Sequence, residues 1–224
     1  MARKPHNSVN NGIAVLGMGR FGRSLAVELV GDDIEVLGVD SDPRVVQSLA
    51  AKLTHVVEAD TTDEDAMRQL GIGDFDVVVV GVGTDLEASI LTASVALALG
   101  VRNIWAKATG SAHARILTQI GVHHVVRPEH DMGRRVAHLV GGGMAEYIEF
   151  DDGYAFAKTT PPPGLVNRSL AGFGVRAEYG VTVVGVKRTD GEFTYATPET
   201  VLRPGDHIIV SGPRHRVEAF SREA

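Results

Sequence analysis

Short runs of β-branched and other apolar residues alternate with stretches of helical periodicity between Gly12 and Gly142. This alternation is typical of a parallel sheet covered by helices on both faces, and it predicts a Rossmann-type, doubly wound α/β fold. Strands are expected at residues 12–17, 35–40, 55–59, 76–82, 103–107 and 123–126. Helices are expected between them at residues 22–30, 43–53, 63–70, 85–99 and 112–120.

The pattern changes after a further predicted helix at residues 132–140 and three glycines at residues 141–143, which are expected to form a hinge. Asp190 and Gly191 predict a hairpin turn, and the prolines at 161–163 predict a rigid connector. Short strands are expected at residues 147–150, 154–159, 181–188, 192–196 and 207–211. We therefore predict two domains: a Rossmann nucleotide-binding domain with its hinge helix at 1–140, and a small α+β domain at 141–224.

Composition narrows the range of functions. The 224 residues carry a net charge of −6, so no basic surface for nucleic acid is expected. The absence of cysteine excludes disulfides, thiolate metal sites and cysteine nucleophiles. The longest apolar run, at residues 77–82, is too short to cross a bilayer. We expect a cytoplasmic protein whose role at a membrane requires a partner.

The strongest motif is a glycine-rich loop at residues 17–22, which follows a predicted strand and opens a predicted helix. Gly17 permits the tight turn, Gly19 lets a phosphate approach the backbone, and Gly22 lets the helix pack on the strand. The helix N-terminus adds free N–H groups and the positive end of the helix dipole. Asp40 ends the second strand, where a carboxylate accepts ribose hydroxyls. The pattern predicts a nucleotide site, with a ligand-free glycine turn as the alternative.

Further polar residues follow the other strands. Asp40 argues against NADP, because its charge repels a 2′-phosphate. Asp60 and Thr61 close the third strand, where adenine commonly binds, and a turn that only leads to helix capping by Thr62 or Asp63 is an equal alternative. Gly83 follows the fourth strand and predicts either close passage of ribose and phosphates or a simple strand-to-helix turn.

Arg20 lies inside the phosphate loop, where backbone N–H groups already suffice for a diphosphate. Its guanidinium is therefore expected to reach a third phosphate or the ligand of a symmetry-related subunit. A solvent-exposed arginine is the alternative.

The sequence does not predict an enzyme. Tyr154 and Lys158 have the spacing of the Tyr/Lys pair of short-chain reductases, but they fall in a predicted strand. A strand would hold them about 13 Å apart, too far to cooperate in proton transfer. No Walker A sequence is present.

Histidines gather before and within the predicted helix at 132–140, at positions 123, 124, 130 and 138, with two carboxylates among them. A transition-metal site is one interpretation, but residues 123 and 124 of a strand face opposite ways, so surface histidines are favoured. Glu129 is different, because one oxygen ligand there completes a hard-cation site only if a second subunit supplies more.

Several segments together resemble the TrkA family, the cytosolic regulatory subunits of bacterial Ktr and Trk potassium-uptake systems, and especially the KtrA type. They are residues 17–22 (GMGRFG), 39–40 (VD), 103–107 (NIWAK) and 128–133 (PEHDMG) in the first domain, and residues 175–180 (VRAEYG) and 202–206 (LRPGD) in the second. The resemblance covers nearly the whole chain from about Gly12.

This resemblance implies an RCK (regulator of potassium conductance) protein. Such proteins form homodimers that assemble into a homo-octameric ring beneath a membrane potassium channel subunit of the KtrB or TrkH type, at the inner face of the membrane. The resemblance implies ATP as the activating and ADP as the inactivating ligand, with NAD(H) also bound by relatives. It places Arg20 against the γ-phosphate of the neighbouring subunit's nucleotide, and Glu129 on a divalent cation, Mg²⁺ or Ca²⁺, at the dimer interface.

The resemblance also implies a cyclic di-AMP site at Val175, Arg176 and Ala177, between paired second domains. The residues expected to bind the nucleotide are Gly17, Met18, Gly19, Arg20, Phe21, Gly22, Asp40, Ser41, Asp60, Thr61, Gly83 and Lys107. Two alternatives stay open at this point: an NAD(H)-dependent oxidoreductase, and a free-standing sensor of nucleotides or cyclic di-AMP.

Overall fold

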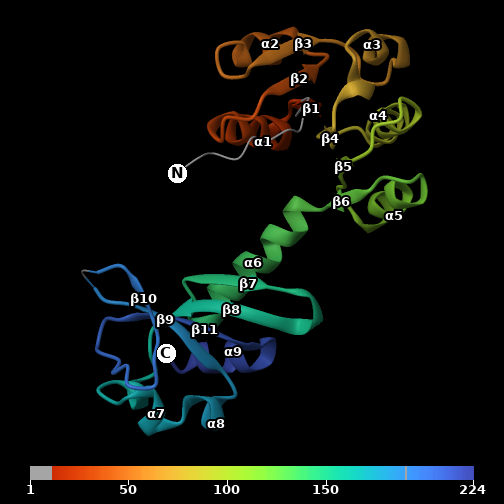
Figure 1. Ribbon diagram of the computed structural model, residues 1–224. Coiled ribbons are helices and arrows are strands. Elements are labelled where there is room, and N and C mark those ends of the chain that lie inside the picture. The colour runs from red at the N-terminus through yellow and green to blue at the C-terminus, as the bar shows by residue number, and fades with distance from the viewer. Residues whose placement is uncertain (1–11, 190) are drawn as a thin grey trace. The chain divides into compact units, whose positions relative to one another are not determined.

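The computed structural model describes residues 12–189 and 191–224, and this described chain divides into two compact units, Met1–Glu129 and His130–Ala224. The predicted boundary at 140/141 falls near the end of the helix that begins just before this division. In Figure 1 the first unit runs from red to green and the second from green to blue.

The described part of the first unit contains one parallel sheet of six strands in the order β3-β2-β1-β4-β5-β6. The strand order reverses between β1 and β4, which is the switch point where open α/β sheets bind ligands. The strands are β1 (Ile13–Leu16), β2 (Val36–Asp40), β3 (His55–Glu58), β4 (Val77–Val80), β5 (Ile104–Lys107) and β6 (His124–Val126). Each predicted strand is confirmed to within two residues at either end.

Helices cover both faces of this sheet, as predicted (Figure 1). Alternate residues of β1 enter opposite cores: Val15 packs with Ala26 of α1, while Leu16 packs with Met67 of α3 and Ala93 of α4. The helices of this unit are α1 (Arg20–Gly31), α2 (Pro43–Leu49), α3 (Glu64–Gln69), the 3₁₀ turn η1 (Ile72–Asp74), α4 (Leu86–Ala98) and α5 (Ser111–Gln119). The arrangement confirms the Rossmann-type fold.

Helix α6 (Pro128–Gly142) differs from the prediction at both ends. It begins four residues before the predicted start, because Pro128 has the φ angle that the first helical position needs and its missing N–H costs nothing there. Gly141 and Gly142, expected in a hinge, continue the helix, and Gly143 ends it with φ of 65°.

The described part of the second unit contains one antiparallel sheet of five strands in the order β10-β9-β11-β8-β7. Asp190, predicted in the hairpin turn, lies outside the described residues, but β9 and β10 pair on either side of it as a hairpin requires. The strands are β7 (Glu146–Glu149), β8 (Tyr154–Thr159), β9 (Thr182–Lys187), β10 (Phe193–Tyr195) and β11 (His207–Pro213).

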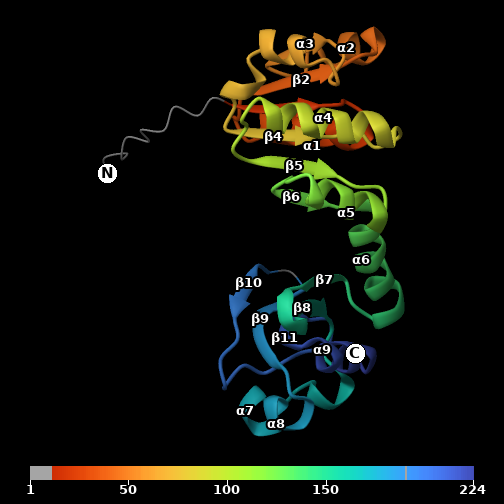
Figure 2. The ribbon, with the colours of Figure 1, turned by 90° about the vertical axis from the view of Figure 1, so that its right-hand side faces the viewer.

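Helix α9 (Arg214–Arg222) packs on β8 and β11 (Figure 2). Its side chains Val217 and Phe220 are fully buried. The sequence analysis missed it, although its buried residues have the i, i+3 spacing of an amphipathic helix. It also missed α7 (Leu170–Phe173) and α8 (Val175–Tyr179), which are too short to show a helical period. Two 3₁₀ turns complete the unit, η2 (Asp151–Gly153) and η3 (Pro163–Leu165).

Among the described residues, no helix combines the length and the apolar character that crossing a bilayer would demand.

Candidate functional site

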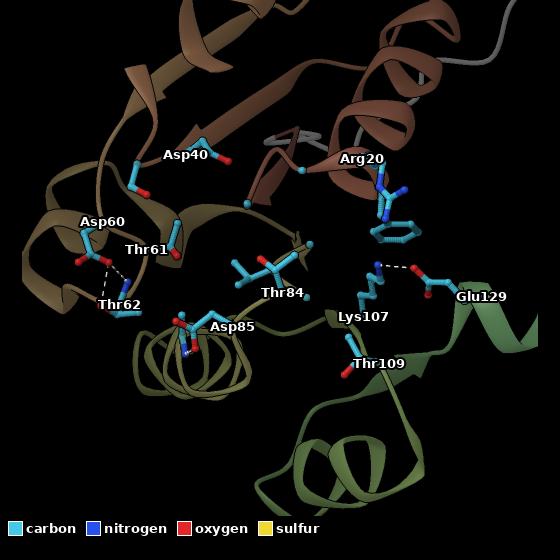
Figure 3. Close-up of a pocket in the computed structure, with 18 residues that line it drawn as sticks. Arg20, Asp40, Asp60, Thr61, Thr62, Thr84, Asp85, Lys107, Thr109 and Glu129 are labelled. Carbon is cyan, nitrogen blue, oxygen red and sulfur yellow. Dashed lines mark hydrogen bonds and ion pairs between the residues drawn. The ribbon is translucent and has the colours of Figure 1, made fainter. Parts of the chain in front are cut away.

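A cavity of about 620 Å³ lies at the carboxyl ends of the parallel strands, beside the switch point between β1 and β4. In Figure 3, Asp40, Asp60 and Thr61 lie on one side of it, and Arg20, Lys107 and Glu129 lie on the other. Its lining residues are Gly17, Gly19, Arg20, Phe21, Asp40, Ser41, Asp60, Thr61, Thr62, Gly81, Val82, Gly83, Thr84, Asp85, Ala88, Lys107, Thr109 and Glu129.

The space around the backbone differs among the three glycines of the loop. Gly17 has φ of 91°, and a Cβ there would lie 2.7 Å from the side chain of Val82. A Cβ at Gly22 would overlap the carbonyl oxygen of Gly17, so the absence of a side chain lets α1 approach the loop. Around Gly19, by contrast, a Cβ would meet no described atom within 4 Å. The fold itself therefore requires glycine at 17 and 22, while the space beside Gly19 is open to the cavity.

The N-terminus of α1, which follows the loop, lies at the cavity wall. Gly19 is the N-cap, and no described side chain caps the helix there. The first N–H groups of a helix have no partner within it, so these groups and the helix dipole are available to an anion. This end of the cavity could therefore hold an anionic group such as a phosphate.

Two residues predicted to bind nucleotide do not line the cavity. Met18 is fully buried, and its sulfur packs against the backbone of Gly38. Gly22 is buried in the contact between α1 and the loop. Met18 supports the loop from the side away from the cavity, and Gly22 lets α1 pack closely against the loop.

Asp40 connects the loop to the end of β2. One of its carboxylate oxygens accepts the N–H of Met18 at 2.7 Å, and the other accepts the N–H of Asp42 at 2.9 Å. Each carboxylate oxygen has a further lone pair, so hydroxyl groups of a ligand can still bind. Asp40 therefore fixes the loop as well as facing the cavity.

At the end of β3, Asp60 accepts both the N–H and the hydroxyl of Thr62, at 2.9 and 2.7 Å, and these bonds lower the pKa of its carboxyl group. The hydroxyls of Thr61 and Thr92 lie 2.8 Å apart in the interior. The cap of α3 is Asp63, which accepts the N–H groups of two following residues. Asp63 thus caps α3, as the alternative interpretation had it, and Asp60 and Thr61 also line the cavity.

The opposite side of the cavity is cationic. The ammonium of Lys107 lies 2.7 Å from Oε1 of Glu129 and 5.9 Å from the ring centroid of Phe21. Its stem passes over Gly83, where a Cβ would be 3.3 Å from Cε of Lys107. The ammonium of Lys107, the N–H of Glu129 itself and the nearby charge of Arg20 lower the pKa of the Glu129 carboxyl group.

Glu129 was expected to bind a divalent cation at a dimer interface, with further ligands from a second subunit. Within this chain its carboxylate is held by an ammonium group, and residues 12–189 and 191–224 contain no cluster of three or more His, Asp or Glu side chains suited to a metal ion. The residues of this chain alone therefore do not fit a hard cation, which needs several oxygen ligands.

The histidines make separate contacts. Nδ1 of His123 accepts the N–H of Ile104 at 3.1 Å, and the ring of His124 stacks on Trp105 with centroids 4.2 Å apart. His130 contacts Asp131, and His138 contacts Glu218 at 3.4 Å. Each of these four histidines therefore has a different partner.

The Tyr154 and Lys158 pair lies on strand β8, as expected. The Tyr154 hydroxyl donates to Ser211 at 3.2 Å, and the Lys158 ammonium donates to Glu146 at 3.1 Å. The two side chains therefore have different partners.

A second cavity, of about 670 Å³, lies in the second unit around Val175, Arg176 and Ala177. Nε of Arg176 donates to the hydroxyl of Thr182 at 3.2 Å. The other lining residues are mostly apolar, among them Leu170, Val181, Val183 and Pro198. The three residues expected to bind cyclic di-AMP thus line the same cavity.

Some lining residues were not expected to contribute. Asp85 caps α4 by accepting the N–H of Ala88 at 3.0 Å, and Thr109 follows β5. The sequence does contain a signal for them, namely a polar residue shortly after a predicted parallel strand, because such residues gather at one edge of the sheet.

The sequence profile of the TrkA-N domain matches residues 13–128, and that of the TrkA-C domain matches residues 156–224. The chain is 34% identical to Ktr system potassium uptake protein A of Bacillus subtilis over 215 residues, which cover 96% of this chain and 97% of that protein. It is 33% identical to Ktr system potassium uptake protein C of the same organism over 210 residues, which cover 93% and 95%.

Among solved structures, the fold is similar to that of the GsuK RCK domain, with a TM-score of 0.67 at 18% identity over 99% of this chain and 49% of that one. The GsuK channel bound to NAD gives 0.66 at 17% identity, over 97% and 40%. GsuK bound to ADP gives 0.50 at 17% identity, over 58% and 34%. At these identities the likeness shows the fold alone.

Proposed function

The chain belongs to the RCK family of TrkA-N and TrkA-C domain proteins, and from this premise we propose that it is a nucleotide-binding regulatory subunit of a potassium-uptake system. The resemblance found in the sequence is thereby confirmed. The relatives of this chain are potassium uptake proteins of the Ktr system, so the family argues against the oxidoreductase alternative.

One observation carries the nucleotide assignment. Gly19 opens onto the cavity beside the uncapped N-terminus of α1, where a side chain would meet only empty space. The fold does not need glycine there, but a phosphate lying against the backbone does. The residues we assign to the ligand are Gly17, Gly19, Arg20, Phe21, Asp40, Ser41, Asp60, Thr61, Gly83 and Lys107, with Met18 and Gly22 supporting the loop.

The ligand we propose is ATP or ADP. The nucleoside end would lie by Asp40 and Asp60, and the phosphates would extend over the loop toward Arg20 and Lys107 (Figure 3). NAD(H) is the alternative ligand, since solved GsuK proteins carry NAD in one case and ADP in another. The acid at Asp40 disfavours NADP.

Regulation requires that a ligand bind two conformations unequally, because equal binding shifts no equilibrium. An arginine that reaches a neighbouring subunit's third phosphate would supply this difference between ATP and ADP. We propose that exposed Arg20 has this role, within a homodimer that assembles into an octameric ring. The ring would act from the cytoplasm on a membrane potassium channel subunit. A divalent cation at Glu129 would require ligands from a second subunit.

The cavity around Arg176 supports a second ligand of the same regulatory protein. Its largely apolar walls would accept flat bases, and the guanidinium would meet phosphate, as cyclic di-AMP requires. A free-standing sensor without a channel partner would use the same two cavities.

Gly19→Leu tests the nucleotide assignment. The φ of −62° at this N-cap suits any residue, and the new side chain would fill the space of the phosphate without clashing with the protein. Gly110→Leu is the matched control, because Gly110 is also the N-cap of a helix, has extended backbone, and has no described atom within 4 Å of its Cβ position.

Calorimetry on protein stripped of ligand, with ATP, ADP and NADH in turn, should show binding to the parent chain and to Gly110→Leu. Gly19→Leu should lose at least tenfold in affinity while unfolding at nearly the same temperature. Unchanged affinity in Gly19→Leu, or no binding to the parent chain, would contradict the assignment. Native mass would show whether the chain forms the proposed octamer.

A further inference from the structure

Lys107 and Glu129 differ sharply in how they are held. The Lys107 side chain is 13% exposed, and it is fixed between the backbone at Gly83 and the ring of Phe21. The Glu129 side chain is 66% exposed, and its contact with the cavity wall is made through the ammonium of Lys107. The lysine is therefore a fixed part of the cavity, and the glutamate is the partner that is free to leave.

The position of this pair in the cavity indicates what competes for it. Backbone N–H groups of the loop at 17–22 suffice for a diphosphate. Lys107 lies on the side of the cavity opposite Asp40 and Asp60, together with Arg20 (Figure 3). A nucleotide whose sugar lies by Asp40 would bring its outermost phosphate to this cationic side.

We propose that the Glu129 carboxylate is an internal competitor for the outermost phosphate of the nucleotide: it occupies the ammonium of Lys107 in the free protein, and the third phosphate of ATP displaces it. This inference rests on the proposed nucleotide function and adds a residue that determines specificity.

The competition makes the site respond to the length of the phosphate chain. A monophosphate that does not reach Lys107 leaves the pair intact, so its affinity is independent of Glu129. A triphosphate must first break a charge-assisted hydrogen bond. Glu129 is the second residue of α6, which continues into the second unit, so the displaced carboxylate lies at the start of the segment that connects the units.

Glu129→Gln tests the competition. The variant keeps the shape of the side chain and removes its charge, so ATP should bind about fivefold more tightly, which is the range expected for a partly exposed ion pair. AMP should bind with unchanged affinity. The measurement is titration calorimetry on the full chain with a chelator present, so that no divalent cation contributes.

Asp131→Asn is the matched control, because it removes the same charge from the same helix. Asp131 contacts His130 and does not line the nucleotide cavity. Its affinity for ATP should equal that of the parent chain. An equal gain in both variants would mean that net charge alone is responsible, and would overturn the inference.

A Lys107→Met background separates the inference from a general effect of Glu129. With the ammonium gone there is nothing to compete for, so adding Glu129→Gln should leave ATP affinity unchanged. A gain of the same size in this background would overturn the proposal. ATP binding that is unchanged or weaker in Glu129→Gln alone would overturn it while leaving the nucleotide function intact, whereas a parent chain that binds no nucleotide would remove both.

Discussion

A Cβ atom added to Gly22 would lie 2.1 Å from the carbonyl oxygen of Gly17. The first turn of α1 and the start of the loop after β1 are therefore in backbone contact, with no room for a side chain between them. A Cβ atom added to Gly19 would meet no described atom within 4 Å. Packing thus explains two glycines of one motif, and our proposal assigns the remaining one to a ligand.

Gly22→Ala should lower the free energy of unfolding of the first unit by about 2 kcal/mol, because the added methyl must push the helix from the loop. Gly31→Ala, at the other end of α1, is the control, since no described atom lies within 4 Å of its Cβ position. Denaturant unfolding of both variants measures the difference. Equal stabilities would show that the loop yields without cost.

Arg20→Ala should weaken ATP binding about tenfold and leave ADP binding nearly intact, because only ATP has a third phosphate for the guanidinium to hold. Arg23→Ala removes the same charge from the same helix at a position outside the cavity. Calorimetry with both nucleotides gives the ratio of affinities. Equal losses for ATP and ADP in Arg20→Ala would refute the role of Arg20.

Burial and the neighbouring Glu149 carboxylate raise the pKa of Tyr147 to about 12. Above pH 10 the unfolded chain releases this proton while the folded chain retains it, so the free energy of unfolding falls as the pH rises from about 10 to about 12. In Tyr147→Phe the free energy of unfolding should fall by about 2 kcal/mol less over this pH range, because the variant has no such proton to release. Denaturant unfolding of the parent chain and of Tyr147→Phe across this pH range measures the difference. If the free energy of unfolding fell equally with pH in both proteins, the prediction would be contradicted.

Asp206 is 2% exposed and accepts hydrogen bonds from the Arg188 guanidinium and, at 2.8 Å, from the N–H of Arg203. Asp206→Asn should destabilise the second unit by about 2 kcal/mol, because the amide replaces a buried charge-assisted acceptor. Exposed Glu199→Gln provides the comparison. Thermal unfolding should separate the two variants clearly, and similar melting temperatures would count against a stabilising role for Asp206.

The sequence predicted the parallel sheet well because each strand there is a short apolar run between polar turns. Strand β8 was predicted at its observed bounds, since Ala155, Ala157 and Thr159 alternate with more exposed neighbours. Helices α7 and α8, on either side of Gly174, were missed because four or five residues are too few to show a period.

Within the site, the sequence located the loop, Asp40 and the residues after β3, since each depends on its position at the end of a strand. It did not determine which way a side chain points within the loop. Met18 was expected at the ligand, but it packs inward against Gly38.

By itself, the sequence determined the strands, the helices of the first unit and the place of the glycine-rich loop, because periodicity and the need for glycine are properties of the local backbone. Only the tertiary structure brought Lys107 to Glu129, which follows it by 22 residues, and left the space beside Gly19 open. Contacts of this kind depend on how β5, β6 and α6 pack side by side, and no local pattern encodes that distance.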